Sequence, residues 1–454
     1  MKISELKTIL ESNQQRYLRE LAELIAFKSV ANNPENHPSC LACAKWLETH
    51  LSAIGFKTEL LPTDGQPIVY AELIKDKALP TVLVYGHYDV QPADLSDGWD
   101  HDPFNMKIKG DDFFARGAGD NKGQTFYIIK AAEELIKADA LSVNLKFMIE
   151  GEEEIGSPNT ITALPKYADK LSADSLLICD DLMFSPAQPV ISIGMRGIFA
   201  LNIKLTGPSN DLHSGLFGGL LKNPAAEISK LVASLFNADG SIAVAGYYDN
   251  VSAVSDEDQK LIDSLPAKPE QAKLIGMPIA GTEKDFAPLE SNLFRPTIEI
   301  NGIQSGYNGP GSKSVIPAEA IANISCRTVH GQDSDRLLKL IQEHLKQHCP
   351  EDLKLEFTFE EPGCPGFKSS PNGPLAAKAK EVLDSLFPNE TIFYSSPATI
   401  PIIPHLHKEI ASDIVVTGFG HEDDAWHGLN EKFSVSRFRN GFVFTGKLLG
   451  GGVN

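Results

Sequence analysis

Four glutamates crowd into the segment EGEEEIG (150–156), directly after the apolar run VNLKFMI. Like charges this close repel one another, and burying even one ionised carboxylate costs roughly several kcal/mol unless a positive charge pairs with it. Carboxylate oxygens are common ligands of divalent cations, which can supply that charge. The cluster therefore needs a positive charge close by, which the segment itself does not contain.

Other histidines and aspartates also follow strand-like apolar runs. TVLVYG leads into His87-Tyr88-Asp89, SLLIC leads into Asp180-Asp181, and DIVVTGF precedes HEDDAWHGLNE, while Asp120 opens a helix at the Gly-rich turn RGAGDNKG. Taken singly, each of these residues is usually a turn residue or a helix cap. In an open α/β sheet, however, functional groups gather at the carboxyl ends of the strands, so together these segments predict one site.

Histidine nitrogen with carboxylate oxygen is a ligand set that suits zinc, manganese or cobalt and needs no cysteine. Asp89 stands two residues after His87, where its carboxylate can accept the other ring N–H and fix the tautomer. Cys40 and Cys43 form a single C-x-x-C within a helical pattern and have no second Cys or His pair nearby. We expect these two thiols to pack within a helix.

The composition narrows the function classes. The 454 residues include 41 Lys plus Arg against 60 Asp plus Glu, a net charge of −19, which argues against a nucleic-acid or anionic-membrane partner. No segment approaches the ~18–20 apolar residues of a membrane span, and the N-terminus reads as an amphipathic helix and not as a signal peptide. Six cysteines in a chain this long favour a cytoplasmic location without a disulfide scaffold.

The elements that must position these side chains alternate between strands and helices up to about residue 196. Helices over 121–139 and 159–170, with buried strands between, predict a three-layer α/β catalytic domain with a mostly parallel sheet. From Gly197 the pattern changes to half-exposed strands, a helix near 224–236, a long polar helical stretch and a helix near 333–347. We expect an inserted two-layer α+β domain over 197–371 and a discontinuous catalytic domain over 1–196 and 372–454.

The motifs GHYDVQP, RGAGDNKG, EGEEEIGS, ICDD and WHGLNE together resemble the co-catalytic dinuclear metallopeptidase family of carnosinase, acetylornithine deacetylase, succinyl-diaminopimelate desuccinylase and aminoacylase. The segments GHYDVQPADLSDGWDHDPF, DLHSGLFGG and GYNGPGSKSVIP look closest to the carnosinase-like, cytosolic non-specific dipeptidase branch. The resemblance implies an inserted lid and dimerisation domain. It also implies hydrolysis of dipeptides or short peptides that carry a free C-terminal carboxylate.

The same resemblance assigns a role to each candidate residue. His87 and Asp180 would bind one metal, Glu154 and His427 the other, and Asp120 would bridge the two; Asp89 would orient His87, and Glu153 would be the general base toward a water between the metals. Each subunit would hold two divalent metal ions, with zinc expected and manganese or cobalt as alternatives.

The inserted domain would complete the site. The resemblance implies that His213 reaches the active site of the partner subunit in a homodimer and polarises the scissile carbonyl. Arg327 would bind the substrate carboxylate, for which a planar guanidinium is suited. Ser314 and Thr399 would be further substrate contacts, and the only other partner expected is a small peptide substrate.

Several points stay open in the sequence. The chemistry also fits an N-acyl-amino-acid deacylase or a carboxypeptidase, and a catalytically inactive binding protein is disfavoured because all five ligands and Glu153 are present. Pro397-Ala398 stand where the family often has Gly-Gly, Asn121 stands where Asp is common, and His421 competes with His427 as a ligand. Within EGEEEIG, we expect Glu152 to face solvent and assign Glu150 no role.

Overall fold

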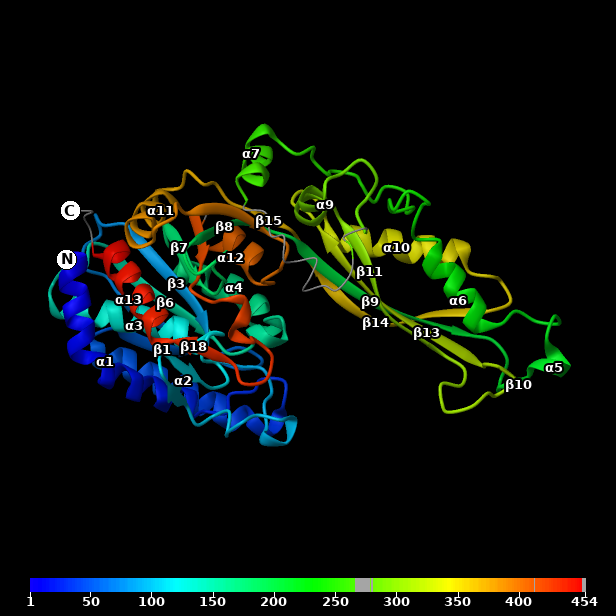
Figure 1. The fold of residues 1–454 in the computed structure, drawn as a ribbon, viewed down its shortest axis with the longest axis horizontal. Coiled ribbons are helices and arrows are strands. Elements are labelled where there is room, and N and C mark those ends of the chain that lie inside the picture. Colours follow the sequence, from blue (N-terminus) through cyan, green and yellow to red (C-terminus); the bar gives the residue numbers. More distant parts are fainter. Residues whose placement is uncertain (266–277, 279–280, 412, 451–454) are drawn as a thin grey trace. The chain divides into compact units, whose positions relative to one another are not determined.

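The computed structural model describes residues 1–265, 278, 281–411 and 413–450. The chain forms two compact units, and both are interrupted in sequence (Figure 1). The first comprises Met1–Ile193, Ser369–Tyr394 and Ile400–Asn454, and the second comprises Gly194–Lys368 and Ser395–Thr399.

A mixed sheet forms the centre of the first unit. Its strands follow the spatial order β1 (Lys57–Leu61), β2 (Ile68–Leu73), β6 (Asn144–Glu150), β3 (Thr81–His87), β7 (Ser175–Cys179), β17 (Asp413–Thr417) and β8 (Val190–Met195), and β16 (Ile392–Ser396) also pairs with β8. The four central strands β6, β3, β7 and β17 are parallel, whereas β1, β2 and β8 pair antiparallel. The carboxyl ends of the four parallel strands therefore lie at one edge, as the sequence predicted.

Helices cover both faces of this sheet and confirm the three-layer α/β class (Figure 1). One core lies beneath α1 (Ile3–Ile25), α2 (His37–Ile54), α3 (Lys122–Lys137), α11 (Pro374–Leu386) and α13 (Val435–Leu449). The other face carries α4 (Pro158–Leu171) and α12 (Ile403–Glu409), which contact each other. Alternate residues of β3 separate the layers, because Val82 and Val84 belong to the first core and Leu83 is buried outside it. A small sheet of β18 (Lys432–Ser434), β5 (Asp112–Phe114) and β4 (Lys107–Lys109) lies in the same unit.

The second unit is a two-layer α+β fold. Its antiparallel sheet has the order β11 (Thr297–Ser305), β13 (Glu319–Thr328), β9 (Gly197–Thr206) and β14 (Lys354–Cys364). Alternate residues of β9 are buried with the apolar faces of α6 (Pro224–Ala233) and α10 (Ser334–His348). The short strand β10 (Leu212–His213) pairs with β12 (Val315–Ile316) and is followed directly by α5 (Ser214–Phe217). The strand β15 (Phe367–Lys368) pairs with the end of β8.

The long polar helix expected after residue 236 is wrong for the described part of that stretch. Two short helices, α7 (Asp256–Ser264) and α9 (Pro288–Phe294), stand there instead. Gly240, Gly246 and Asn250 adopt positive φ angles, which a continuing right-handed helix does not allow. Residues 266–277 and 279–280 lie outside the described residues. Among the described helices, none combines the length and apolar character needed to cross a bilayer.

Candidate metal centre

The structure brings the predicted ligands together at the carboxyl edge of the central sheet. His87 is the last residue of β3, Asp180 follows β7, and Glu153 and Glu154 lie in a 3-10 turn that follows β6. Asp120 precedes α3, and His427 lies in the loop after β17 with a left-handed backbone. Five separate segments therefore supply the site.

Asp120 occupies the centre of this group and faces both histidines. Its Oδ1 atom lies 3.2 Å from His87 Nε2, and its Oδ2 atom lies 2.9 Å from His427 Nε2. Asp180 Oδ2 is 3.5 Å from His87 Nε2, and Glu154 Oε2 is 3.2 Å from His427 Nε2. Two sets of one histidine and one carboxylate thus share the two oxygens of Asp120.

This donor set fits a pair of divalent cations. His87 Nε2 is buried and makes no hydrogen bond, although it points at two carboxylates. His87, Asp120 and Glu154 offer ligand atoms that all lie within 4.8 Å of one another. Neutral imidazole nitrogen with carboxylate oxygen is the chemistry that zinc, manganese and cobalt share, so these residues do not select among the three metals.

The carboxylates perturb both histidines. Burial lowers the pKa of His87, but the carboxylates of Asp120, Asp180 and Asp89 beside its ring outweigh burial and raise that pKa well above its usual value. Hydrogen bonds with Asp120 and Glu154 raise the pKa of His427 to about 10. In the absence of metal, the surrounding carboxylates therefore favour the protonated form of both rings. A metal must displace a proton from each, because an imidazole nitrogen binds metal only in its unprotonated form.

Glu153 lies at the edge of this group, with Oε2 4.0 Å from His87 Nε2. Burial raises the pKa of its carboxyl well above the usual value, and Asp180, Asp120 and Glu154 add to the effect against the opposing charge of His87. A carboxyl that holds a proton more tightly than an exposed glutamate is suited both to take a proton and to return it. A cation bound nearby would lower this pKa again.

Asp89 makes two sets of contacts. His87 Nδ1 lies 3.1 Å from the Asp89 carbonyl oxygen and 3.4 Å from its carboxylate, so Nδ1 carries the hydrogen and leaves Nε2 free to bind metal. The same carboxylate accepts hydrogen bonds from the backbone N–H groups of Glu153 at 3.2 Å and Glu154 at 3.0 Å. Asp89 therefore orients both the candidate ligand His87 and the turn that carries Glu153 and Glu154.

Three side chains that hold the candidate ligands in place were not predicted from the sequence. Gln91 Nε2 donates to Glu154 Oε2 at 2.8 Å, and Asn121 Nδ2 donates to Asp180 Oδ1 at 2.8 Å. Glu431 is fully buried, and its carboxylate accepts hydrogen bonds from the loop that carries Asp120. The sequence did signal the last two, because Asn121 replaces a commonly acidic residue and Glu431 ends the motif WHGLNE.

The structure corrects the expectation that Glu152 faces solvent. Its side chain is buried, and its carboxylate accepts hydrogen bonds from Gln66 N at 2.9 Å, Asn159 N at 3.3 Å and Asn159 Nδ2 at 3.1 Å. These donors compensate for the lost hydration of the charge. Glu150 is also buried and accepts hydrogen bonds from Tyr85 and Ser157, so all four glutamates of the segment have defined surroundings.

His427 lies against Asp120 and Glu154, whereas His421 has other neighbours. The charged groups around His421 are Arg437, Asp424, Asp423 and Lys432. Cys40 and Cys43 are buried in α2 as free thiols, as expected for helix packing.

The predicted substrate residues of the second unit form two separate pairs. His213 caps α5, and the N–H of its neighbour Ser214 donates to the Ser314 carbonyl oxygen at 3.0 Å. Arg327 Nη1 donates to Thr399 Oγ1 at 2.8 Å. In β13, Arg327 pairs with Ile198 at one end of β9, whereas Glu319 pairs with Thr206 at the end from which β10 continues. Eight residues of strand, about 27 Å, separate the two ends.

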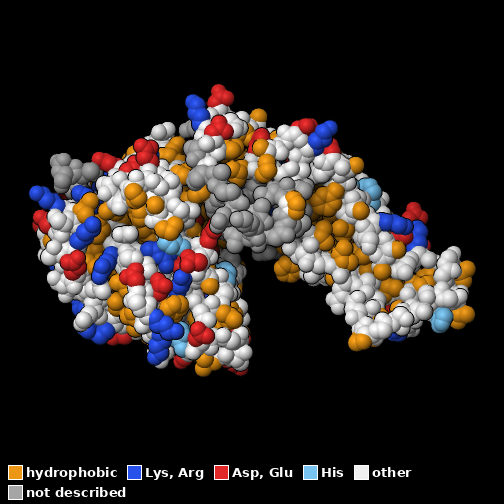
Figure 2. Space-filling view, in the orientation of Figure 1, with side chains coloured by type: hydrophobic (Ala, Val, Ile, Leu, Met, Phe, Trp, Pro, Cys, Tyr) orange, Lys and Arg blue, Asp and Glu red, His pale blue; other side chains and the backbone are white. Residues whose placement is uncertain are grey.

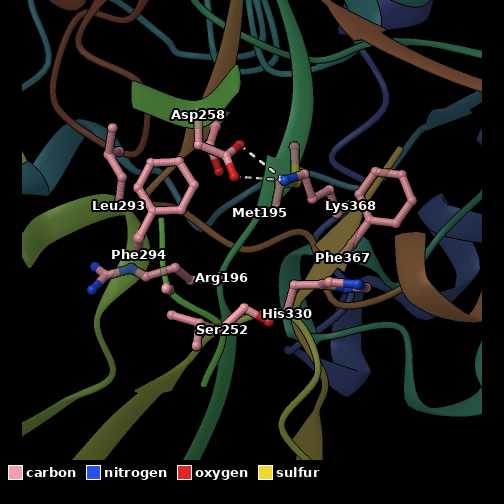
Figure 3. Close-up of a pocket in the computed structure, with 12 residues that line it drawn as sticks. Met195, Arg196, Ser252, Asp258, Leu293, Phe294, His330, Phe367 and Lys368 are labelled. Atoms are coloured by element: carbon pink, nitrogen blue, oxygen red, sulfur yellow. Dashed lines mark hydrogen bonds and ion pairs between the residues drawn. The ribbon is translucent and has the colours of Figure 1, made fainter. Parts of the chain in front are cut away.

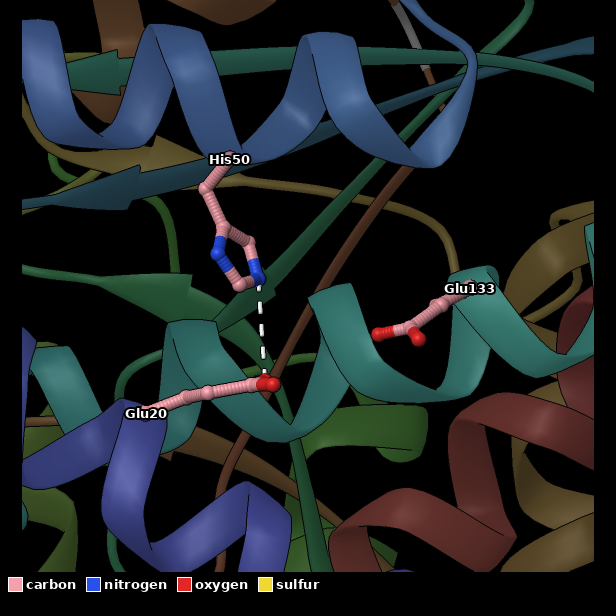
Figure 4. Close-up of side chains that lie close together, drawn as sticks. All are labelled: Glu20, His50 and Glu133. Atoms are coloured by element: carbon pink, nitrogen blue, oxygen red, sulfur yellow. Dashed lines mark ion pairs between the residues drawn. The ribbon is translucent and has the colours of Figure 1, made fainter.

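A second group of ligand-type side chains lies apart from this centre. Glu20, His50 and Glu133 come from α1, α2 and α3 (Figure 4). Lys130 Nζ lies between them, 2.5 Å from Glu20 Oε2, 2.6 Å from His50 Nε2 and 2.8 Å from Glu133 Oε2. Burial and the Lys130 charge lower the pKa of His50 to about 4. The lysine ammonium takes the position of a cation, so this group is an ion-pair network.

Comparisons with known proteins agree with this geometry. The profile of peptidase family M20/M25/M40 matches residues 83–450. The chain is 30% identical to the Cys-Gly metallodipeptidase DUG1 of Candida albicans, over 97% of this chain and 95% of the relative. It is 29% identical to the human Beta-Ala-His dipeptidase, over 94% and 88% of the two chains. Among solved structures, the metallo-carboxypeptidase Sso-CP2 of Sulfolobus solfataricus is similar with a TM-score of 0.85 and 29% identity, over 96% of this chain and 98% of that one.

Proposed function

The chain belongs to peptidase family M20/M25/M40, and from this premise we propose that it hydrolyses the peptide bond of dipeptides with a free C-terminal carboxylate at a pair of divalent metal ions. One observation carries the proposal: the two oxygens of Asp120 face His87 and His427, and each histidine is joined by a second carboxylate. The names of the relatives, which are metallodipeptidases, support the substrate class.

His87 and Asp180 would hold one ion, Glu154 and His427 the other, and Asp120 both. Two bound divalent ions would supply a water of lowered pKa and positive charge for the oxyanion that forms at the scissile carbon. Glu153 would take the proton of the attacking water and pass it to the leaving amine, for which its buried carboxyl beside His87 is suited. Zinc is the metal we propose, with manganese or cobalt as alternatives.

Arg327 and Thr399 would bind the C-terminal carboxylate of the substrate. A guanidinium can hold a carboxylate through two parallel hydrogen bonds. The hydroxyl of Thr399 accepts from Arg327 and donates its one hydrogen to the Arg196 carbonyl oxygen at 2.5 Å, so it orients the guanidinium and would have to turn from Arg196 to donate to the substrate. Recognition of this group would restrict the enzyme to substrates that end within reach of the metal centre. Dipeptides satisfy that restriction.

The proposal includes a homodimer in which His213 and Ser314 act on the partner's substrate. A dipeptide spans about 7 Å, so it cannot contact both ends of a sheet that are about 27 Å apart. His213 adjoins exposed apolar side chains on α5 and in the turn after it, and orange side chains gather there in Figure 2. Leu216 and Leu220 are 71% and 75% exposed, which supports a buried position in an assembly.

In this proposal the first unit is the catalytic domain and the second is the lid and dimerisation domain. We also propose a cytoplasmic location, which the six free cysteines support.

The test is a substrate panel with purified protein loaded separately with zinc, manganese or cobalt. Free dipeptides, the same dipeptides as C-terminal amides, N-acetyl amino acids and longer peptides should be compared by kcat/KM. We expect cleavage of the free dipeptides and a loss of at least ~100-fold for the amides, because Arg327 would lose its charged partner. Cleavage confined to N-acetyl amino acids would identify a deacylase instead, and release of C-terminal residues from long peptides would identify a carboxypeptidase.

A further inference from the structure

A pocket of about 90 Å³ lies within the second unit and is not used by the proposed chemistry (Figure 3). This volume exceeds the ~10–15 Å³ that one water molecule needs. Most of its walls are apolar, with Phe294 and Leu293 on one side and Met195 and Phe367 on another. The remaining lining residues are Arg196, Ser252, Ala253, Asp258, Val329, His330, Lys368 and Ser395.

The pocket adjoins the residues proposed to hold the substrate carboxylate. Arg196 is a wall of the pocket, and its Nε donates to the Pro397 carbonyl oxygen at 3.0 Å. The Arg196 carbonyl oxygen accepts the Thr399 hydroxyl, to which Arg327 also donates. Two direct hydrogen bonds therefore connect the pocket wall to Arg327.

Residues close in sequence to Arg327 and Thr399 also line the pocket. Val329 and His330 line the pocket and follow Arg327 within three residues, and Ser395 lines it four residues before Thr399. Both segments that carry the carboxylate-binding pair thus continue into the pocket walls. A substrate residue whose carboxylate binds the Arg327 guanidinium would therefore have its own side chain next to this space.

The apolar walls of the pocket favour an uncharged occupant. Lys368 and Asp258 point toward each other, and Lys368 Nζ lies 2.9 Å from both carboxylate oxygens (Figure 3). This pairing neutralises the lysine, whereas Arg196 keeps its charge, because its Nε donates to the neutral carbonyl oxygen of Pro397. Leu293, Phe367 and Met195 are almost fully buried, so an apolar side chain that enters the pocket leaves water for an apolar wall.

We propose that this pocket receives the side chain of the C-terminal substrate residue and selects an aliphatic group such as that of leucine or methionine. The inference rests on the proposed function, since it places the substrate by its carboxylate. Pro397 and Ala398, which replace the Gly-Gly common in the family, belong to the segment that Arg196 holds. The preference for the C-terminal substrate residue would therefore depend on residues 395–399 of this chain.

The experiment measures kcat/KM of the metal-loaded enzyme for Ala-Gly, Ala-Ala, Ala-Leu, Ala-Lys and Ala-Glu. We expect Ala-Leu to exceed Ala-Gly by at least ~10-fold, and the two charged substrates to fall below Ala-Leu by a similar factor. Two variants alter the pocket. Phe294→Ala removes a wall, and Ala253→Leu fills space from an exposed position and so leaves the core intact. Each should lower the Leu/Gly ratio by at least ~5-fold.

Phe359→Ala is the matched control, because Phe359 is an exposed phenylalanine of the same unit and lies outside the pocket lining. It should leave the ratio unchanged. If Ala-Leu and Ala-Gly are cleaved equally well, or if both pocket variants keep the wild-type ratio, the subsite is wrong although the dipeptidase proposal stands. If no dipeptide is cleaved with any of the three metals, the proposed function itself fails.

Discussion

Glu431 holds the backbone of Asp120. Its Oε1 atom accepts hydrogen bonds from the N–H of Asp120 at 3.1 Å and of Gly119 at 2.9 Å, and its Oε2 atom accepts from Gly117 N at 3.0 Å and Arg116 Nη1 at 2.8 Å. A fully buried carboxylate thus fixes the loop that carries the candidate bridging ligand. Because Glu431 also follows His427 by four residues, it links two candidate ligands, Asp120 and His427, that are 307 residues apart.

Glu431→Gln should weaken metal binding. The amide offers one acceptor oxygen instead of two and turns an N–H₂ group toward other donors, so Asp120 loses its fixed position. We expect the affinity for the more weakly held ion to fall by about 10- to 100-fold, as for other groups that orient ligands. Chelator competition measures this affinity. Glu422→Gln, at an exposed glutamate, is the control, and unchanged affinity in Glu431→Gln would contradict the role.

Glu153→Gln should abolish turnover without releasing metal. Glu153 is proposed as the base and Glu154 as a ligand, so substitutions of these two neighbours should have different effects on turnover and on metal content. We expect kcat to fall by at least ~100-fold in Glu153→Gln with KM nearly unchanged. Glu154→Gln should instead lower the metal content measured by elemental analysis. Retained turnover in Glu153→Gln would refute the base assignment.

Metal binding should release protons. The raised pKa of His427, about 10, means that this ring is protonated near pH 7.5 in protein stripped of metal, and His87 is raised in the same direction. A bound metal needs the neutral ring, so affinity should fall as pH falls. Titration calorimetry in two buffers of different ionisation enthalpy measures the release. We expect release of at least about one proton per subunit on metal binding, and release of fewer protons in His427→Asn. Equal heats in both buffers would contradict the predicted proton release.

Mixed dimers should restore activity to two inactive variants. If His213 acts on the partner's substrate, His213→Ala and Arg327→Met each inactivate a homodimer. A hybrid dimer then contains one intact site, which combines Arg327 of one chain with His213 of the other. Unfolding and refolding the two variants together should recover about a quarter of the wild-type activity, because about half of the dimers are hybrids. No recovery from a verified mixture of dimers would contradict action in trans.

Glu150→Gln should change how stability depends on pH. Burial raises the pKa of Glu150 from 4.5 to about 7. Its stabilising contribution is therefore present below pH 4.5 and lost as pH rises toward 7, a difference of about 3 kcal/mol. Glutamine keeps an acceptor for Tyr85 and Ser157 and does not titrate. The melting temperature of the variant relative to wild type should rise by roughly 2–4 °C between pH 5 and pH 8. A pH-independent difference would contradict the prediction.

The sequence predicted the α/β class and most helices because their apolar spacing is regular and local. The helix expected over 121–139 spans 122–137, and that over 159–170 spans 158–171. It failed after residue 236, where polar residues suit a helix but positive φ angles at Gly240 and Asn250 break the chain into turns. It also placed Glu152 in solvent, because its partners Gln66 and Asn159 become visible only when the chain has folded.

By itself, the sequence determined which residue types follow each strand, and the family resemblance carried by five motifs in order implied metal-dependent hydrolysis. Only the tertiary structure decided which oxygen faces which nitrogen. His87 and His427 are 340 residues apart, and they share Asp120 because β3 and β17 end at one sheet edge and Glu431 holds the loop between them. Likewise, only the tertiary structure showed that the segments carrying His213 and Arg327 lie at opposite ends of β13. Local pattern fixes the chemistry of a side chain, whereas distances across the chain depend on packing.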